Sequence, residues 1–162
     1  MAAEELDLVL ERLPRHPRFA EIPTALRDWL LPIDWDRERL WALDLPRRRL
    51  KLKELRWHLD LPWLRQDGVW FQLTPREFLA APTAHPEHAG RVGSADLSYP
   101  LHVVPRHRRW LILDGIHRLA KAEMLGLTDV LVSTLTPADI VKAARHPAGV
   151  HDRRPYVSEA PA

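Results

Sequence analysis

One hydrophobic periodicity gives way to another at an Asp-Gly turn formed by Asp114 and Gly115, and this change of pattern indicates the fold. A short apolar run before the turn predicts a strand over 110–113. Apolar residues after it recur at helical spacing, which predicts a helix over 116–125 that ends at Gly126. Because glycine lets a chain turn tightly from a strand into a helix, a mixed α and β domain is expected.

Further strands are predicted on both sides of this turn. Apolar runs predict strands over 101–104 and 130–135, and 110–135 is expected to form a βαβ-like unit. Earlier in the chain, leucines alternate with charged residues and predict a half-buried strand over 50–55. The predicted fold class is α+β, a small mixed β-sheet flanked by helices with an N-terminal helical extension.

The length of 162 residues is that of one ordinary domain. We divide it into an N-terminal helical extension (1–40), a main domain (41–145) and a flexible tail (146–162). Helical spacing in the extension predicts helices over 4–13 and 24–31.

Composition excludes several classes of chemistry. The sequence has no cysteine, so disulfides, thiolate nucleophiles, cysteine-bound zinc and iron–sulfur clusters are ruled out. No apolar run approaches the roughly 20 residues of a membrane-spanning helix, so no membrane partner is expected. The first residues lack the pattern of a secretory signal, so a cytoplasmic protein is expected. The net charge of +2 is too balanced to predict nucleic-acid binding by itself.

The predicted turn is a candidate anion site. The first backbone N–H groups of the helix, at Ile116, His117 and Arg118, have no intrahelical acceptor, and the helix dipole favours an anion there. Lys121 lies three residues after Arg118 and can lean over the same ligand. The alternative is that Asp114 caps the helix while Arg118 pairs with a surface carboxylate.

The segment 110–126, with the sequence WLILDGIHRLAKAEMLG, resembles the phosphate-binding motif of the ParB/sulfiredoxin superfamily. The resemblance covers about residues 48–137 and is strongest over 100–126. It implies that a nucleotide (ATP, ADP or CTP) with Mg²⁺ binds at the turn, with phosphates held by Gly115, His117 and Arg118. No protein-ligated metal site is assigned.

The branches of this superfamily imply different activities. Sulfiredoxins carry a catalytic cysteine where Ile116 stands, so their reductase activity is excluded. Partition proteins bind CTP and continue into a helix-turn-helix, for which 136–162 is expected to be too short. Free-serine kinases carry Asp-Gly-His-His-Arg, which this chain matches in all but the first histidine. Their catalytic base, which follows the first strand, would correspond to Asp60 or Glu54, and Asp114 could orient waters of the metal.

Other residues leave two interpretations open. Arg91 could contact phosphate or form a surface ion pair. His85 and His88 have a spacing found in metal sites, but a solvated helix start is the simpler reading and no third ligand is evident. The basic turn 106–109 is either solvated or contacts nucleic acid or an acidic partner. The seven tryptophans serve core packing or base stacking.

Three functions are therefore weighed. The first is a nucleotide-dependent phosphotransferase or nucleotide hydrolase. The second is a nucleotide-sensing or adaptor module that acts on a protein partner without catalysis. The third, a ParB-like nuclease or DNA-binding protein, is not favoured because the charge is balanced.

Overall fold

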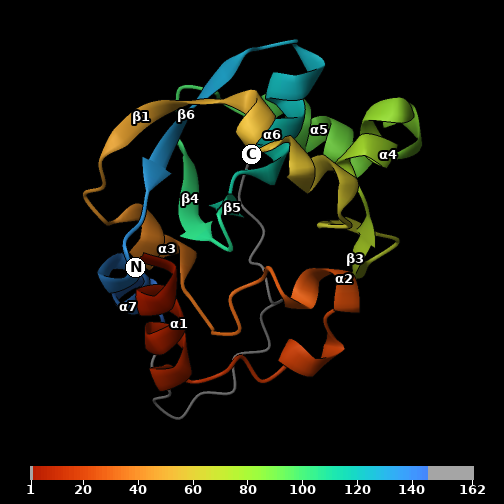
Figure 1. The fold of residues 1–162 in the computed structure, drawn as a ribbon. Helices are drawn as coiled ribbons and strands as arrows, with labels where there is room; N and C mark the ends of the chain where they lie inside the picture. Colours follow the sequence, from red (N-terminus) through yellow and green to blue (C-terminus); the bar gives the residue numbers. More distant parts are fainter. Residues whose placement is uncertain (1, 146–162) are drawn as a thin grey trace.

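The computed structural model describes residues 2–145 (Figure 1). Its α-helices are α1 (Ala2–Arg12), α2 (Thr24–Arg27), α3 (Arg37–Trp41), α4 (Pro75–Ala80), α5 (Pro86–Ser94), α6 (Ile116–Met124) and α7 (Pro137–Ala143). Its 3-10 helices are η1 (Phe19–Glu21), η2 (Leu52–Glu54), η3 (Arg56–Asp60) and η4 (Pro82–Ala84). Its strands are β1 (Arg47–Lys51), β2 (Leu64–Gln66), β3 (Val69–Leu73), β4 (Leu101–Arg106), β5 (Arg109–Asp114) and β6 (Asp129–Thr134).

The main sheet has the strand order β1-β6-β4-β5, and β2 and β3 form a separate hairpin. Strand β6 runs parallel to β4, while the β1/β6 and β4/β5 pairs are antiparallel. The predicted α+β class is therefore confirmed. The predicted βαβ-like unit over 110–135 is wrong in its pairing, since β6 pairs with β4 and leaves β5 at the edge. Periodicity along the chain identifies strands but does not reveal which strand each one pairs with.

The sheet separates two hydrophobic cores. Successive residues of β5 point to opposite faces, so Leu111 and Leu113 enter one core and Ile112 enters the other. The core around Ile112 is closed by α6 together with η2 and η3, which contribute the buried side chains of Leu119, Leu52 and Leu59 respectively.

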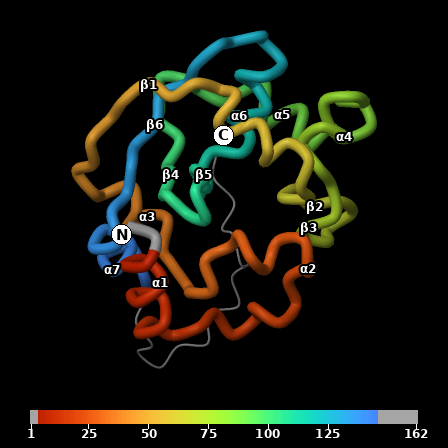
Figure 2. Tube along the Cα trace, in the orientation of Figure 1, coloured from red at the N-terminus to blue at the C-terminus, as the bar shows by residue number. Residues whose placement is uncertain are grey.

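The other core contains the N-terminal segment and α7. Leu6, Leu10 and Leu26 pack in the same cluster as Leu111 and Ile140. Figure 2 shows α1, coloured red, beside α7, coloured blue, although they come from opposite ends of the described chain. The residues expected to form an extension thus build one face of the central core.

Several predicted boundaries change. The strand expected over 50–55 ends at Lys51, and the chain continues as η2 and η3. The reason is that Leu52, Leu55 and Leu59 are spaced by three and four residues, which is a helical spacing, and all three are fully buried. Helix α2 is shorter than the predicted 24–31, and Pro23 rather than Thr24 occupies its N-cap position.

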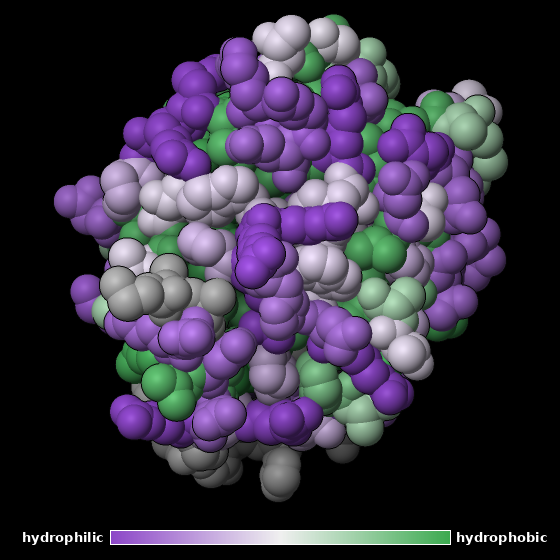
Figure 3. All heavy atoms as spheres, in the orientation of Figure 1, coloured by the Kyte–Doolittle hydropathy of each residue, from purple (hydrophilic) through white to green (hydrophobic). Residues whose placement is uncertain are grey.

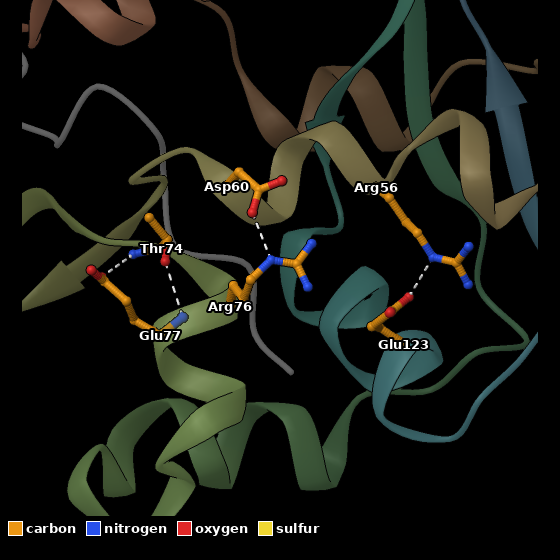
Figure 4. Close-up of polar contacts among 6 residues, drawn as sticks. All are labelled: Arg56, Asp60, Thr74, Arg76, Glu77 and Glu123. Carbon is orange, nitrogen blue, oxygen red and sulfur yellow. Dashed lines mark hydrogen bonds and ion pairs between the residues drawn. The ribbon is translucent and has the colours of Figure 1, made fainter.

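Other predictions are confirmed. Helix α6 begins at Ile116 and is followed by Gly126 with a positive φ of 69°. The sequence Thr74-Pro75 also predicts a capped helix start, and Thr74 does cap α4 through a reciprocal capping box with Glu77, as Figure 4 shows. The tail predicted over 146–162 lies outside the described residues.

On the face of the molecule seen in the orientation of Figure 1, hydrophobic residues form small green areas between hydrophilic ones (Figure 3). None of the helices within residues 2–145 is both long enough and apolar enough to cross a membrane.

Candidate functional site

A cavity of about 570 Å³ opens at the end of β5, against the first turn of α6. Residues 114–118, here called the 114–118 turn, form one wall. The other walls come from the connection between α3 and β1, from the β2–β3 hairpin, and from α5 with the segment that follows it. Elements distant in the sequence therefore meet around the predicted anion site.

Gly115 is the N-cap residue of α6 and has a φ of +121°, a backbone conformation that residues with a β-carbon rarely adopt. A β-carbon built there would lie 2.8 Å from Cγ of Leu101 on β4. No side chain caps this helix. The first backbone N–H groups of α6 are consequently left to face the cavity or a ligand within it.

Asp114 is buried at the start of this turn and is held by neighbours from three elements. Its Oδ2 accepts hydrogen bonds from Nε1 of Trp41 at 2.9 Å and from Nη2 of Arg118 at 3.0 Å. Nδ1 of His102 lies 3.7 Å from the same oxygen. Burial would raise the pKa of Asp114, but His102, Arg118 and Trp41 outweigh it and lower the pKa to about 2. The carboxylate is therefore ionised.

Arg118 joins the turn to the start of β4. Its Nη1 donates to the carbonyl oxygen of Pro100 at 2.5 Å, while its Nη2 donates to Asp114. A guanidinium has five N–H groups, so these two bonds leave others for a ligand in the cavity that Arg118 lines. Asp114 does not cap α6, and the carboxylate that pairs with Arg118 is the buried one at the turn rather than one on the surface.

His117 forms a pair with His88 of α5, here called the histidine dyad. Nδ1 of His88 lies 3.0 Å from Nε2 of His117, and Nε2 of His88 lies 2.6 Å from the carbonyl oxygen of Arg65. Both rings line the cavity. Burial, His88 and the cationic Arg91 lower the pKa of His117 to about 3, so its imidazole is neutral at pH 7. A neutral ring avoids the repulsion that an imidazolium would meet at a helix N-terminus.

Arg91 lies in the cavity wall on α5. Its Nη2 is 3.7 Å from Oε1 of Glu87, a carboxylate that also forms an ion pair with Arg65. Arg91 therefore forms the ion pair and also lines the cavity, where its contact with phosphate stays a prediction.

Aromatic rings also line the cavity. Three tryptophans and one tyrosine contribute, namely Trp41, Trp63, Trp70 and Tyr99. The guanidinium of Arg65 lies over the ring of Trp70, 5.4 Å from its centroid. Trp57 does not line the cavity and instead packs against Trp29 at a centroid distance of 4.4 Å.

Three predicted site residues lie outside the cavity wall. The ammonium of Lys121 donates to the carbonyl oxygens of Gly93 and Ala95, at 3.0 and 2.6 Å, and so fixes the end of α5. Asp60 is exposed and pairs with Arg76 of α4 at 2.6 Å (Figure 4). Glu54 is exposed on η2. Asp60 and Glu54 are displaced because the chain winds into η2 and η3 where a longer strand was expected.

Sequence reasoning missed several residues of the cavity wall. Trp41, Asp44, Arg65 and His102 line the cavity, yet none belongs to a motif. The sequence did give a signal for His88, whose spacing from His85 suggested a metal pair, and for the tryptophans as a group, which suggested base stacking. The structure instead joins His88 to His117, and within residues 2–145 no three His, Asp or Glu side chains are grouped to hold a metal.

The basic turn after β4 makes contacts within the protein. His107 Nε2 lies 3.0 Å from the carbonyl oxygen of Asp28, and buried Arg106 donates to the same oxygen at 3.3 Å. Arg109 lies over the rings of Trp29 and Trp57, 5.4 Å from each centroid. Arg106, His107 and Arg109 of the turn 106–109 therefore contact Asp28 or Trp29 and link the N-terminal helices to the sheet.

Comparison with known proteins gives no relative: no family model, curated protein or solved structure matches this chain.

Proposed function

We propose that this protein binds a nucleotide in the cavity, with the phosphates at the 114–118 turn and the base against the aromatic wall. One observation carries the proposal. The uncapped first turn of α6 opens into a cavity that also presents guanidinium groups and indole rings. Phosphates and nucleobases are the chemical groups that this combination suits.

The phosphate end has two kinds of donor. Backbone N–H groups at the start of α6 can donate to phosphate oxygens, and the helix dipole favours their charge. Arg118 and Arg91 line the same space and add charge-assisted hydrogen bonds. Asp114 keeps Arg118 directed along the turn by accepting from its Nη2.

The aromatic end suits a base. Indole rings stack on nucleobases with little regard to their identity, and each stacked base contributes about 1–3 kcal/mol. Trp63 and Trp70 lie on or beside the β2–β3 hairpin, away from the turn in sequence but on the same cavity. The volume of about 570 Å³ lies in the range of small-molecule sites.

The carboxylates do not make a complete magnesium site. Four carboxylates line the cavity, namely Asp44, Glu87, Asp96 and Asp114. Asp114 is held by Trp41 and Arg118, Glu87 pairs with Arg65, and Asp96 accepts from Ser98. No three His, Asp or Glu side chains within residues 2–145 are grouped to hold a metal. Magnesium is commonly held by one or two carboxylates, waters and substrate phosphates, so a nucleotide would bring the ion with it.

Nucleotide binding in a sensing or adaptor role is favoured over phosphotransfer. Phosphotransfer to a hydroxyl needs a base within reach of that hydroxyl. The two residues suggested for it, Asp60 and Glu54, lie outside the cavity wall. A nucleotide ligand agrees with the cytoplasmic location expected from the sequence.

Thermal unfolding with ATP, ADP and CTP, each with and without Mg²⁺, tests the proposal. One nucleotide should stabilise the protein, by about 2.7 kcal/mol at 100-fold over its Kd. Nucleotide consumption measured in the same samples separates binding from turnover. Stabilisation without consumption supports a sensing role, whereas the absence of any stabilisation contradicts nucleotide binding.

A further inference from the structure

The hydrogen bonds of the histidine dyad fix where its protons lie. The carbonyl oxygen of Arg65 can only accept, so Nε2 of His88 must carry the proton in that 2.6 Å contact. In a neutral imidazole the other nitrogen is then an acceptor. Nδ1 of His88 therefore accepts from Nε2–H of His117 across 3.0 Å.

His117 is left with its lone pair on Nδ1. A neutral ring that carries its proton on Nε2 has an unprotonated Nδ1. Within residues 2–145 this nitrogen has no hydrogen-bond partner, and His117 lines the cavity. The rings are nearly coplanar, with planes 23° apart and centroids 5.3 Å apart, so they meet edge to edge through the N···N contact. The dyad therefore holds the orientation of His117 as well as its tautomer.

We infer that Nδ1 of His117 is a hydrogen-bond acceptor for a hydroxyl group of the bound nucleotide. The inference rests on the proposed function and adds which group the ligand must present at this point. Neighbouring backbone N–H groups favour oxygen atoms that carry charge. A bare nitrogen beside them repels such an atom and is satisfied by an O–H donor. The hydroxyl can come from the sugar or from a protonated phosphate.

The charged and titratable groups around His117 agree with a neutral acceptor. His88 and Arg91, both on α5, oppose its protonation, while Glu87 on α5 and Asp114 on β5 favour it. Burial of the ring opposes protonation as well. The balance keeps the lone pair on Nδ1.

Nitrogen NMR of the full chain labelled with ¹⁵N-histidine tests the tautomer directly. At pH 8, His88 and His117 should both show a proton on Nε2 and none on Nδ1. Saturation with the best-binding nucleotide should then shift the Nδ1 resonance of His117. A proton on Nδ1 of His117 in the free protein overturns the inference, whatever the nucleotide result.

Two substitutions give an independent measure. His117→Asn keeps an acceptor near the position of Nδ1, whereas His117→Leu removes it. We expect His117→Leu to weaken nucleotide binding about tenfold, as for one lost hydrogen bond of about 1.4 kcal/mol, and His117→Asn to retain most of the affinity. His85→Leu, at a histidine that packs against Phe78 outside the cavity wall, is the matched control.

Ligand analogues identify the hydroxyl. The sugar is assigned if a 2′,3′-dideoxynucleotide binds wild type about tenfold more weakly than the parent nucleotide does. The same analogue should then bind His117→Leu with the affinity that it has for wild type. Selective binding of inorganic phosphate over sulfate, lost in His117→Leu, assigns a protonated phosphate. If nucleotide binds but His117→Leu equals wild type, the acceptor role is wrong and nucleotide binding stands. If no nucleotide binds, both proposals fail.

Discussion

The indole N–H of Trp41 donates to the buried carboxylate of Asp114 across 73 positions of sequence, at 2.9 Å. Trp41 is itself 43% exposed, and the guanidinium of Arg37 lies 5.3 Å from its ring centroid. Through this bond the end of α3 contacts the first residue of the 114–118 turn, and both residues line the cavity. Asp114 in turn accepts from Arg118, so the N-terminal segment positions the predicted phosphate site.

Trp41→Phe should therefore lower stability and raise the pKa of Asp114. Phenylalanine keeps most of the ring but leaves the carboxylate one donor short. The expected loss is about 1.5–3 kcal/mol, the contribution of a hydrogen bond to a charged group, measured by urea unfolding. Trp110→Phe is the control, because Trp110 is partly buried and lies outside the cavity wall. Equal effects of both substitutions would show that the bond to Asp114 contributes nothing.

Gly115→Ala should be strongly destabilising. The positive φ strains any side chain with a β-carbon, at about 1–3 kcal/mol, and the contact with Leu101 adds an overpacking cost of similar size. Gly90→Ala on α5 meets nothing within 4 Å and should instead stabilise by about 0.5–1 kcal/mol. Thermal unfolding of both variants checks the opposite signs. A neutral Gly115→Ala would be incompatible with the described turn.

Stability should fall on acidification through His58, in addition to the contribution of His117, whose pKa is also lowered to about 3. The fully buried ring of His58 accepts from the N–H of Ile112 at 3.0 Å, and its Nδ1 lies 2.8 Å from the carbonyl oxygen of Leu55. Burial lowers its pKa from 6.5 to about 3. Between those values the unfolded chain binds the extra proton, so stability is full above pH 6.5 and declines below it, by up to about 1.4 kcal/mol per pH unit.

Urea unfolding from pH 8 to pH 4 measures this slope. His58→Gln should be less stable at pH 8 because the Ile112 contact is disturbed, and its decline below pH 6.5 should be shallower. If His58→Gln retains the full wild-type slope, His58 is not the source of the acid sensitivity.

Asp60→Asn and Glu54→Gln should leave nucleotide affinity unchanged. Both side chains are exposed and neither lines the cavity. Asp60→Asn removes only the surface ion pair with Arg76, which screening by solvent makes weak. Titration calorimetry on each variant checks this. A large loss of affinity for Asp60→Asn would mean that the nucleotide reaches η3 and that the cavity is not the site.

The sequence predicted the local parts of this structure. The Asp-Gly turn and α6 were found because glycine and helical spacing act over a few residues, and the same holds for the cap at Thr74. The contacts of Asp114 with Trp41 and of His117 with His88 were not predicted. They join elements 73 and 29 positions apart and depend on how the sheet is ordered, which no local pattern records.

The position of the suggested base shows the same limit. Leucines at 50, 52 and 55 fit both a strand and the start of a helical segment. After Lys51 the leucines are buried against α6 and the chain is helical. Asp60 therefore lies at the surface, where it pairs with Arg76 of α4. A short apolar pattern cannot distinguish these outcomes without its packing partners.

Calorimetric titration of ATP, ADP and CTP with Mg²⁺ into the full chain measures whether the cavity binds a nucleotide. At least one nucleotide should bind saturably at one site per chain. Arg91→Ala should weaken that binding at least tenfold, because a charge-assisted hydrogen bond is lost, and Arg76→Ala on the surface should leave it unchanged. If none of the nucleotides binds, or if both variants bind as wild type does, the cavity is not a nucleotide site.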